Sequence, residues 1–302
     1  MSSVNTAVAT VMADYGKRTL VWLDNTIQAA APRRASLRCV VGDTVDVELD
    51  PTSHTLWLSK VYPRRNALYR ADITKQKCFA ANLDGVFLML APQPAPLLDL
   101  LARTLVASHT AGIPLHIILN KIDLPDFEVL MPLIKMLDAA SIPYTALTTQ
   151  SVSSVNALLP ALYGRRCLIL GQSGVGKSSL INTLIPDARV QTQALSNATL
   201  TGKHTTTSSY LYQSGIKNSL DSPYFEVIDS PGFQNFGLAH VPPHQWIEAF
   251  TTLTPNIVNC RFYNCTHRHE PNCGIIHALD EGCNQSWYNL LQGLHDGPRA
   301  VG

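Results

Sequence analysis

The sequence predicts a multidomain protein with an N-terminal β-barrel, a central α/β domain and a mostly helical C-terminal domain. Three observations predict it. Short strand-like segments separated by turns fill roughly the first seventy residues, apolar strands alternate with helices from about Asn82, and four of the seven cysteines lie between residues 260 and 283. We expect the domains to span residues 1–75, 76–236 and 237–302.

Composition limits the class of protein. With 302 residues, 46% of them hydrophobic and 15% charged, the chain can bury a substantial core. Its longest apolar runs, such as residues 86–91, have the length of a strand and not the roughly 20 residues that span a bilayer. The N-terminus has no pattern of a secretory signal, and the number of cysteines is odd. We therefore expect a soluble cytoplasmic protein without membrane contact, whose clustered cysteines bind metal.

The N-terminal segment resembles a small β-barrel. Strands are expected at residues 8–12, 20–23, 44–49 and 56–61. The clearest alternation of apolar and polar side chains, residues 45–49, follows the turn pair Gly42-Asp43. An oligonucleotide-binding (OB) barrel is one such architecture, and its exposed face commonly contacts nucleic acid, although strand count alone does not separate it from other small barrels.

Basic residues cluster locally although the net charge is only +1. The two clusters consist of Arg33, Arg34 and Arg38, and then of Arg64, Arg65 and Arg70.

The central region alternates apolar strands with helices. A strand at residues 86–90 precedes a helix at 97–110 and a second strand at 115–119, and further strands are expected at 166–170 and 225–228. Continuous apolar strands of this kind form parallel sheets with helices on both faces.

Residues 171–178 fit the G-x-x-x-x-G-K-S pattern of a phosphate-binding loop, and they have the required strand before them and helix after them. The glycines let backbone N–H groups surround a phosphate chain at a helix N-terminus. Lys177 should reach the β- and γ-phosphates, and Ser178 should bind Mg²⁺. The loop residues expected to contact nucleotide are Gly171, Ser173, Gly174, Val175, Gly176, Lys177, Ser178 and Ser179.

Two further segments are expected at the γ-phosphate. Asp229 follows an apolar strand, where its carboxylate can hold magnesium through water, and the Gly232 amide can sense the γ-phosphate. The polar segment at residues 202–207 resembles a switch loop that orders on binding. Thr205 and Thr206 are both expected to contact nucleotide; one of them should bind magnesium, and we assign Thr206.

A guanine-reading motif, Asn120-Lys121-Ile122-Asp123, follows the strand at residues 115–119. The Asp123 carboxylate can accept hydrogen bonds from the ring N–H and the exocyclic amine of guanine, which adenine does not offer. This motif precedes the phosphate loop, whereas ordinary GTP-binding domains have the opposite order, so the sequence predicts a circularly permuted GTPase domain. Residues 144–148 are a weak match to a loop that touches the base.

The C-terminal cluster consists of Cys260, Cys265, His267 and Cys273, with the spacing C-x4-C-x-H-x5-C. Three thiolates and an imidazole favour a tetrahedral zinc ion. Because all four positions are taken by protein ligands, we expect one structural Zn²⁺ instead of a catalytic one.

Together these motifs resemble the RsgA (YjeQ) family of circularly permuted bacterial GTPases. The resemblance also includes Gly42-Asp43 with Val45, residues 63–66 and residues 80–84. It implies a GTPase that converts GTP to GDP and phosphate late in assembly of the small (30S) ribosomal subunit and is stimulated by that subunit. It also implies that the barrel and the zinc domain contact ribosomal RNA. We further expect a monomer that other assembly factors can accompany.

The resemblance and the local chemistry both assign a catalytic role to His204. Many GTPases orient the attacking water with a glutamine after the D-x-x-G motif, but here the next residue is Phe233, which cannot do so. The expected catalytic residues are therefore His204, Lys177 and Asp229.

Two alternative functions remain open from sequence. One is a permuted GTPase with another duty, such as large-subunit assembly or RNA modification. The other is a non-catalytic RNA-binding protein that uses nucleotide as a structural ligand.

Overall fold

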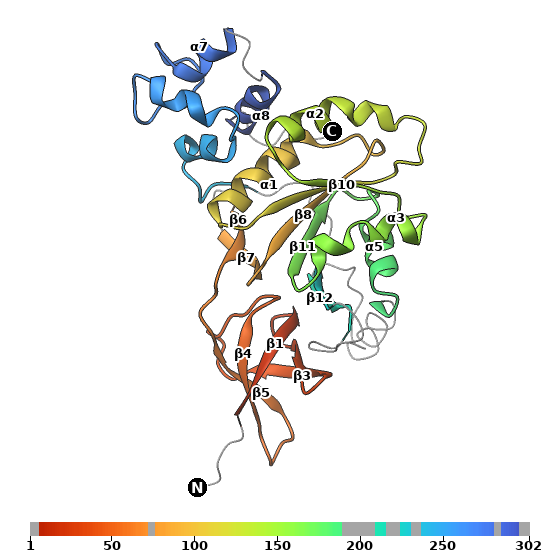
Figure 1. Ribbon diagram of the computed structural model, residues 1–302. Coiled ribbons are helices and arrows are strands. Elements are labelled where there is room, and N and C mark those ends of the chain that lie inside the picture. Colours follow the sequence, from red (N-terminus) through yellow and green to blue (C-terminus); the bar gives the residue numbers. More distant parts are fainter. Residues whose placement is uncertain are drawn as a thin grey trace.

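A computed structural model describes residues 6–71, 76–188, 209–215, 224–230, 237–280 and 285–295. It has three parts in chain order (Figure 1): a β-barrel at one end, a mixed sheet flanked by helices in the middle, and a group of short helices at the other end.

The N-terminal part is a closed barrel of five strands in the order β1-β2-β3-β5-β4. The strands are β1 (Thr6–Asp14), β2 (Thr19–Leu23), β3 (Thr26–Pro32), β4 (Thr44–Leu49) and β5 (Leu56–Val61). All pairs are antiparallel except β3 with β5, and inward side chains such as Val11, Val21 and Leu58 are fully buried. This closed barrel agrees with the predicted OB architecture. The strand β3 was not expected from the sequence.

A hairpin connects the barrel to the central sheet. It consists of β6 (Ala67–Ala71) and β7 (Gln76–Ala81), which pair antiparallel. The barrel residues Met12, Leu20 and Val41 belong to the same hydrophobic cluster as the central sheet. Barrel and sheet therefore share a continuous core.

The central sheet has six strands in the order β10-β9-β8-β11-β13-β12, with only β12 antiparallel. Its strands are β8 (Gly85–Leu90), β9 (Leu115–Leu119), β10 (Tyr144–Ala146), β11 (Arg166–Gly171), β12 (Tyr210–Gln213) and β13 (Glu226–Asp229). The helical segments are α1 (Leu98–Thr110), η1 (Phe127–Leu130), α2 (Met131–Ala139), α3 (Val152–Asn156), α4 (Leu159–Leu162) and α5 (Lys177–Leu184). Figure 1 shows α1 on one side of the sheet and α3 and α5 on the other.

Four short helical segments form the described C-terminal part. They are η2 (Pro243–Ala249), η3 (Thr254–Asn259), α7 (Gly274–Asp280) and α8 (Gln285–His295). Trp287 of α8 is completely buried, and its ring lies edge-on to Phe250, with 6.0 Å between the ring centroids. The Trp287 indole N–H donates to the Met136 carbonyl of α2 at 3.2 Å, which ties this part to the central domain. Within the described ranges, no helix has the length and apolar character needed to cross a membrane.

We expect the substitution Trp287→Ala to lower the free energy of unfolding by about 3 to 5 kcal/mol, because it leaves a large cavity between the C-terminal helices and α2. Urea denaturation followed by circular dichroism measures this loss. The control is Val258→Ala, because Val258 is 84% exposed and should change the value by less than about 0.5 kcal/mol. Equal effects of the two substitutions would contradict this packing.

Candidate functional site

Three polar segments meet at the carboxyl edge of the parallel strands. Asn120 follows β9, the loop at residues 171–176 follows β11, and Asp229 ends β13. The strand β8 separates β9 from β11, and β13 lies on the other side of β11. Ligands of open α/β sheets bind at this edge. The topology therefore brings together segments that lie far apart in the sequence.

The glycines of the loop leave room that no other residue would leave. Gly176 has φ = 110°, and a β-carbon there would overlap the side-chain amide of Asn120. At Gly171 a β-carbon would lie 2.7 Å from the Met89 carbonyl oxygen. The helix α5 begins at Lys177, directly after the loop. The result is a glycine-lined loop at a helix N-terminus, which fits the phosphate groups of a nucleotide.

Lys177 folds back over this loop. Its Nζ donates to the carbonyl oxygens of Gly171 at 2.6 Å and Gln172 at 2.8 Å. Burial lowers the pKa of the Lys177 ammonium, and the charge of Asp229 opposes that shift. The ammonium is thus held beside the loop, within reach of a phosphate that replaces these carbonyl contacts.

Asp229 is a largely buried carboxylate at the end of β13 and is paired in register with Ile169 of β11. Burial raises the pKa of Asp229 to about 6, and Lys177 partly offsets this effect. A divalent cation bound near such a carboxylate favours its ionised form. The donor set of Asp229 and the exposed Ser178 hydroxyl at the start of α5 fits Mg²⁺, which prefers oxygen ligands.

Asn120 and Lys121 bind directly to the phosphate loop. The buried Asn120 donates through Nδ2 to the Val175 carbonyl at 2.8 Å, and its Oδ1 accepts from the Thr149 amide at 3.2 Å. The Lys121 Nζ donates to the Gly174 carbonyl at 3.0 Å. The two motifs that stand in inverted order in the chain are therefore hydrogen-bonded to each other.

Asp123 lies two residues beyond Lys121 and is exposed, so its carboxylate is accessible to a base. The exposed hydroxyls of Ser173 and Ser179 lie on the loop and on α5, whereas the side chain of Val175 is buried. Four expected site residues, His204, Thr205, Thr206 and Gly232, lie outside the residues that the structure describes.

Two glutamines support the site and were not singled out by the sequence patterns. The buried Gln172 donates through Nε2 to the Ala95 carbonyl and accepts through Oε1 from the Leu97 amide, both at 3.1 Å. The main-chain carbonyl of Gln93 accepts a hydrogen bond from Lys121 Nζ at 2.6 Å. Gln172 occupies a variable position of the phosphate-loop pattern, so only its contacts reveal its role.

The segment expected to touch the base begins as a strand. Residues 144–146 form β10 beside β9, and the Leu147 amide donates to the Leu119 carbonyl at 2.9 Å. The loop that follows contacts Asn120 through the amide of Thr149. The expected segment, residues 144–148, is therefore mostly strand, and the loop that contacts Asn120 begins near its end.

A second candidate site lies in the C-terminal part. The ligand atoms of Cys260, Cys265, His267 and Cys273 all lie within 4.8 Å of one another. His267 Nδ1 is 3.6 Å from Cys260 Sγ and 3.4 Å from Cys273 Sγ. Zinc bonds of about 2.3 Å to sulfur and about 2.0 Å to nitrogen at tetrahedral angles require similar separations. The cluster therefore fits a structural Zn²⁺ held by four protein ligands.

Neighbouring side chains hold the backbone of this cluster in place. Tyr288 Oη and Gln292 Nε2 of α8 both donate to the His267 carbonyl, at 2.9 and 2.8 Å. Burial lowers the pKa of the His267 imidazole, which favours the neutral form that binds metal. Since α8 also carries Trp287, the metal cluster is linked to the contact between the C-terminal helices and α2.

This fold and its carboxyl edge define a nucleotide-binding domain of the phosphate-loop class with a guanine-reading motif ahead of the phosphate loop. The chain matches the model of the RsgA GTPase family over residues 61–239. It is 40% identical to the small ribosomal subunit biogenesis GTPase RsgA of Bordetella pertussis over 93% of this chain and 92% of the relative. The corresponding protein of Paraburkholderia xenovorans is 41% identical, with 90% and 87% covered.

Two solved structures have the same fold. YjeQ from Thermotoga maritima superposes with a TM-score of 0.72 at 22% identity and covers 98% of this chain and 100% of its own. YloQ, described as a circularly permuted GTPase, has a TM-score of 0.64 at 19% identity, with 98% and 97% covered.

The chain belongs to the RsgA GTPase family. Membership supports GTP hydrolysis and implies GTP, GDP and Mg²⁺ as ligands, and the Cys/His cluster is consistent with a structural zinc. The predicted family, fold class and enzyme class are thereby confirmed.

We expect Gly176→Ala to weaken GDP binding by at least about tenfold, because the added methyl group displaces the Asn120 amide from the loop. Calorimetric titration with GDP measures the affinity. Gly112→Ala is the matched control: Gly112 also has a positive φ, of 64°, but no atom lies within 4 Å of its added carbon. Equal affinities of the two variants would show that this contact does not shape the loop.

For the metal site, we expect one zinc ion per chain by elemental analysis. Cys265→Ser should lose it, because a hydroxyl is a poor replacement for a thiolate. Cys78→Ser, which changes a cysteine of β7 outside the cluster, should keep it. Full zinc content in the Cys265 variant would rule out this ligand set.

Proposed function

We propose that this protein is a GTPase that acts late in assembly of the small ribosomal subunit and whose hydrolysis of GTP is stimulated by that subunit. The observation that carries the proposal is the pair of relatives about 40% identical over nearly the whole chain, both called small ribosomal subunit biogenesis GTPases. The contacts of Asn120 and Lys121 with the phosphate loop support a guanine nucleotide as the ligand.

We assign the nucleotide contacts from this geometry. Backbone amides of residues 171–176 bind phosphate, Lys177 neutralises the β- and γ-phosphates, and Ser178 and Asp229 hold Mg²⁺, the latter through water. Asp123 reads the guanine edge. In the segments outside the described residues, we assign magnesium to Thr206, a γ-phosphate contact to Gly232, and orientation of the attacking water to His204.

The barrel offers a basic surface for RNA. Arg33, Arg34 and Arg38 are exposed in the segment after β3, although Arg33 also pairs with Glu48. Arg64 and Arg65 of the second basic cluster instead form ion pairs with Asp43 and Asp84 at the joint between barrel and sheet. We therefore place the RNA contact of the barrel at the first cluster, where Arg34 and Arg38 are exposed and form no ion pair within the described residues, because phosphate contacts need accessible cations.

The zinc cluster carries a second surface suited to RNA. Phe262 is 40% exposed and Tyr263 is fully exposed, and the Arg261 guanidinium lies 5.5 Å from the centre of the Phe262 ring. Aromatic rings and guanidinium planes stack on unpaired bases of RNA. We propose that this surface contacts ribosomal RNA of the small subunit.

The organisation of the chain belongs to the same proposal. We propose domain boundaries at residues 1–75, 76–236 and 237–302, a monomer, and a cytoplasmic location where small subunits are assembled. The first boundary falls within the β6–β7 hairpin, and the second falls between β13 and η2.

The proposal is tested by measuring GTP and ATP turnover with and without purified small subunits. We expect turnover of GTP only, with a rate that rises when subunits are added. Lys177→Ala should reduce the stimulated rate at least about a hundredfold, because it removes a cation from the transferring phosphoryl group. Lys135→Ala, an exposed change on α2, is the control. A GTP rate that subunits leave unchanged would contradict the proposed partner.

His204→Ala should lower the stimulated rate about a hundredfold or more while GDP affinity stays unchanged, because the imidazole acts on water and not on the bound nucleotide. His244→Ala, which changes an exposed histidine of η2, serves as the control. Parallel loss of GDP affinity and turnover in the His204 variant would assign a structural role to this residue instead.

A further inference from the structure

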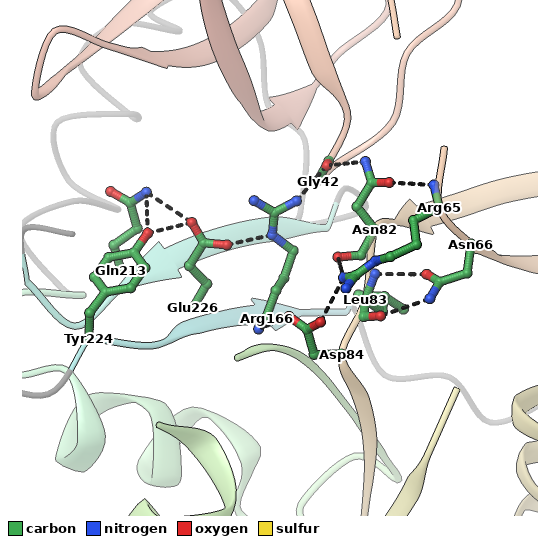
Figure 2. A network of polar contacts seen from close by, with 10 residues as sticks. All are labelled: Gly42, Arg65, Asn66, Asn82, Leu83, Asp84, Arg166, Gln213, Tyr224 and Glu226. Carbon is green, nitrogen blue, oxygen red and sulfur yellow. Dashed lines mark hydrogen bonds and ion pairs between the residues drawn. The ribbon is translucent and has the colours of Figure 1, made fainter. Parts of the chain in front are cut away.

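Arg166 connects the barrel to two strands of the central sheet at the amino edge of that sheet (Figure 2). It is the first residue of β11, and its side chain is only 14% exposed. Its Nη1 donates to the Gly42 carbonyl of the barrel at 2.6 Å, and its Nε forms an ion pair with Glu226, the first residue of β13. Its backbone amide donates to the Asp84 carboxylate at 2.8 Å. One guanidinium thus bridges the barrel and two neighbouring strands.

The Glu226 carboxylate is almost completely buried and depends on these partners. Tyr224 Oη and Gln213 Nε2 donate to its second oxygen. Because Gln213 is the last residue of β12, the network also includes this strand. Burial would raise the pKa of Glu226, but the Arg166 guanidinium and these hydrogen bonds outweigh it, so the pKa is lowered. A buried carboxylate of this kind is strongly destabilised when its cation is removed.

On the barrel side, the Gly42 carbonyl has two donors. Asn82 Nδ2 also donates to it at 2.9 Å, while Asn82 Oδ1 accepts from the Arg65 amide at 2.9 Å. Gly42 itself has φ = 89°, and a β-carbon there would overlap the Ala81 carbonyl. Gly42 is therefore one place where the barrel backbone is held beside the sheet, and the Arg166 side chain connects this carbonyl to Glu226 of β13.

The two strands joined by Arg166 carry the nucleotide site at their other ends. Arg166 is paired in register with Glu226, and Ile169 is paired with Asp229. β11 leads into the phosphate loop, while Asp229 ends β13 about 10 Å from Glu226, at 3.3 Å per residue. A change in the relative position of the two strands at Arg166 therefore changes the distance between the phosphate loop and Asp229.

We propose that Arg166 is a positioning residue for GTP hydrolysis, which transmits the position of the barrel through Gly42 and Glu226 to the relative alignment of the phosphate loop and Asp229. The inference rests on the proposed roles of that loop and of Asp229. It gives the barrel a second role besides contact with RNA: a partner that displaces the barrel changes catalysis through this guanidinium.

Loss of the Arg166 contacts with Gly42 and Glu226 should lower GTP turnover and leave the binding of GDP unchanged. GDP is held by the phosphate loop after β11 and by the base motif after β9, and neither requires β13. Hydrolysis also requires the magnesium-binding Asp229 of β13 in alignment with that loop. Because misplacement of a catalytic group by about 1 Å can cost a hundredfold in rate, loss of this alignment should appear in kcat.

The test compares Arg166→Gln with Arg165→Gln, a control that removes the same charge from an adjacent exposed arginine. We expect Arg166→Gln to lower kcat for GTP at least about tenfold while the Kd for GDP changes by less than about threefold. Arg165→Gln should change neither. The double variant Arg166→Gln with Glu226→Gln, which leaves no unpaired charge, should keep the low kcat and also bind GDP. An unchanged kcat in the Arg166 variant, or a parallel loss of GDP affinity in both Arg166 variants, would overturn the proposal.

Hydrogen–deuterium exchange tests the connection from Gly42 through Arg166 to β13 without measuring turnover. Its result therefore does not depend on whether the proposed GTPase function is correct. We expect Asn82→Ala, which removes the other donor to Gly42, to raise amide exchange at residues 224–230. In the Arg166→Gln background the same change should add nothing there, because the connection to β13 is already broken. Equal increments in both backgrounds would overturn the proposal.

Discussion

The site depends on one constraint: β11 must lie between β8 and β13 in a parallel sheet. The side chains of β11 after Arg166 are completely buried, so only small displacements of the strand keep the core closely packed. Its carboxyl end gives rise to the phosphate loop, its neighbour β13 carries Asp229, and the base motif reaches the loop from β9 beyond β8. The order of the strands in the sheet therefore determines the geometry of the proposed nucleotide site.

This explains why the inverted order of motifs in the chain is compatible with a working site. Parallel strands place their carboxyl ends at one edge whatever the connections between them. In this protein the connections serve other purposes. The barrel is connected to β8 by the β6–β7 hairpin. The C-terminal segments α8 and η2 pack on α1, and Trp287 of α8 is hydrogen-bonded to α2. Both flanking parts thus contact the nucleotide-binding domain directly, and Arg166 makes a direct polar connection between the barrel and the strands of the site.

Much of this could be predicted from the sequence, because the signals are local. Apolar runs predicted β8, β9, β11 and β13, and metal-ligand spacing predicted the four residues that the structure brings within 4.8 Å. Contacts between distant segments could not be predicted in this way. Gln172 is a variable position in a motif, and Arg166 belongs to no pattern; their roles follow from partners 75 and 124 residues away. Strand β3 was missed because its residues, Thr26–Pro32, include a run of three alanines and end in proline, which are poor strand signals.

The central claim is that the motif before the phosphate loop and the loop itself form one guanine nucleotide site, and calorimetric titration of Asp123→Ala with GDP and ADP tests it most directly. Asp123 is exposed, so its removal should leave the fold intact. We predict that the unmodified protein prefers GDP by orders of magnitude, and that the variant binds GDP as weakly as ADP while its affinity for ADP is unchanged. A variant that keeps its preference for GDP would contradict the account.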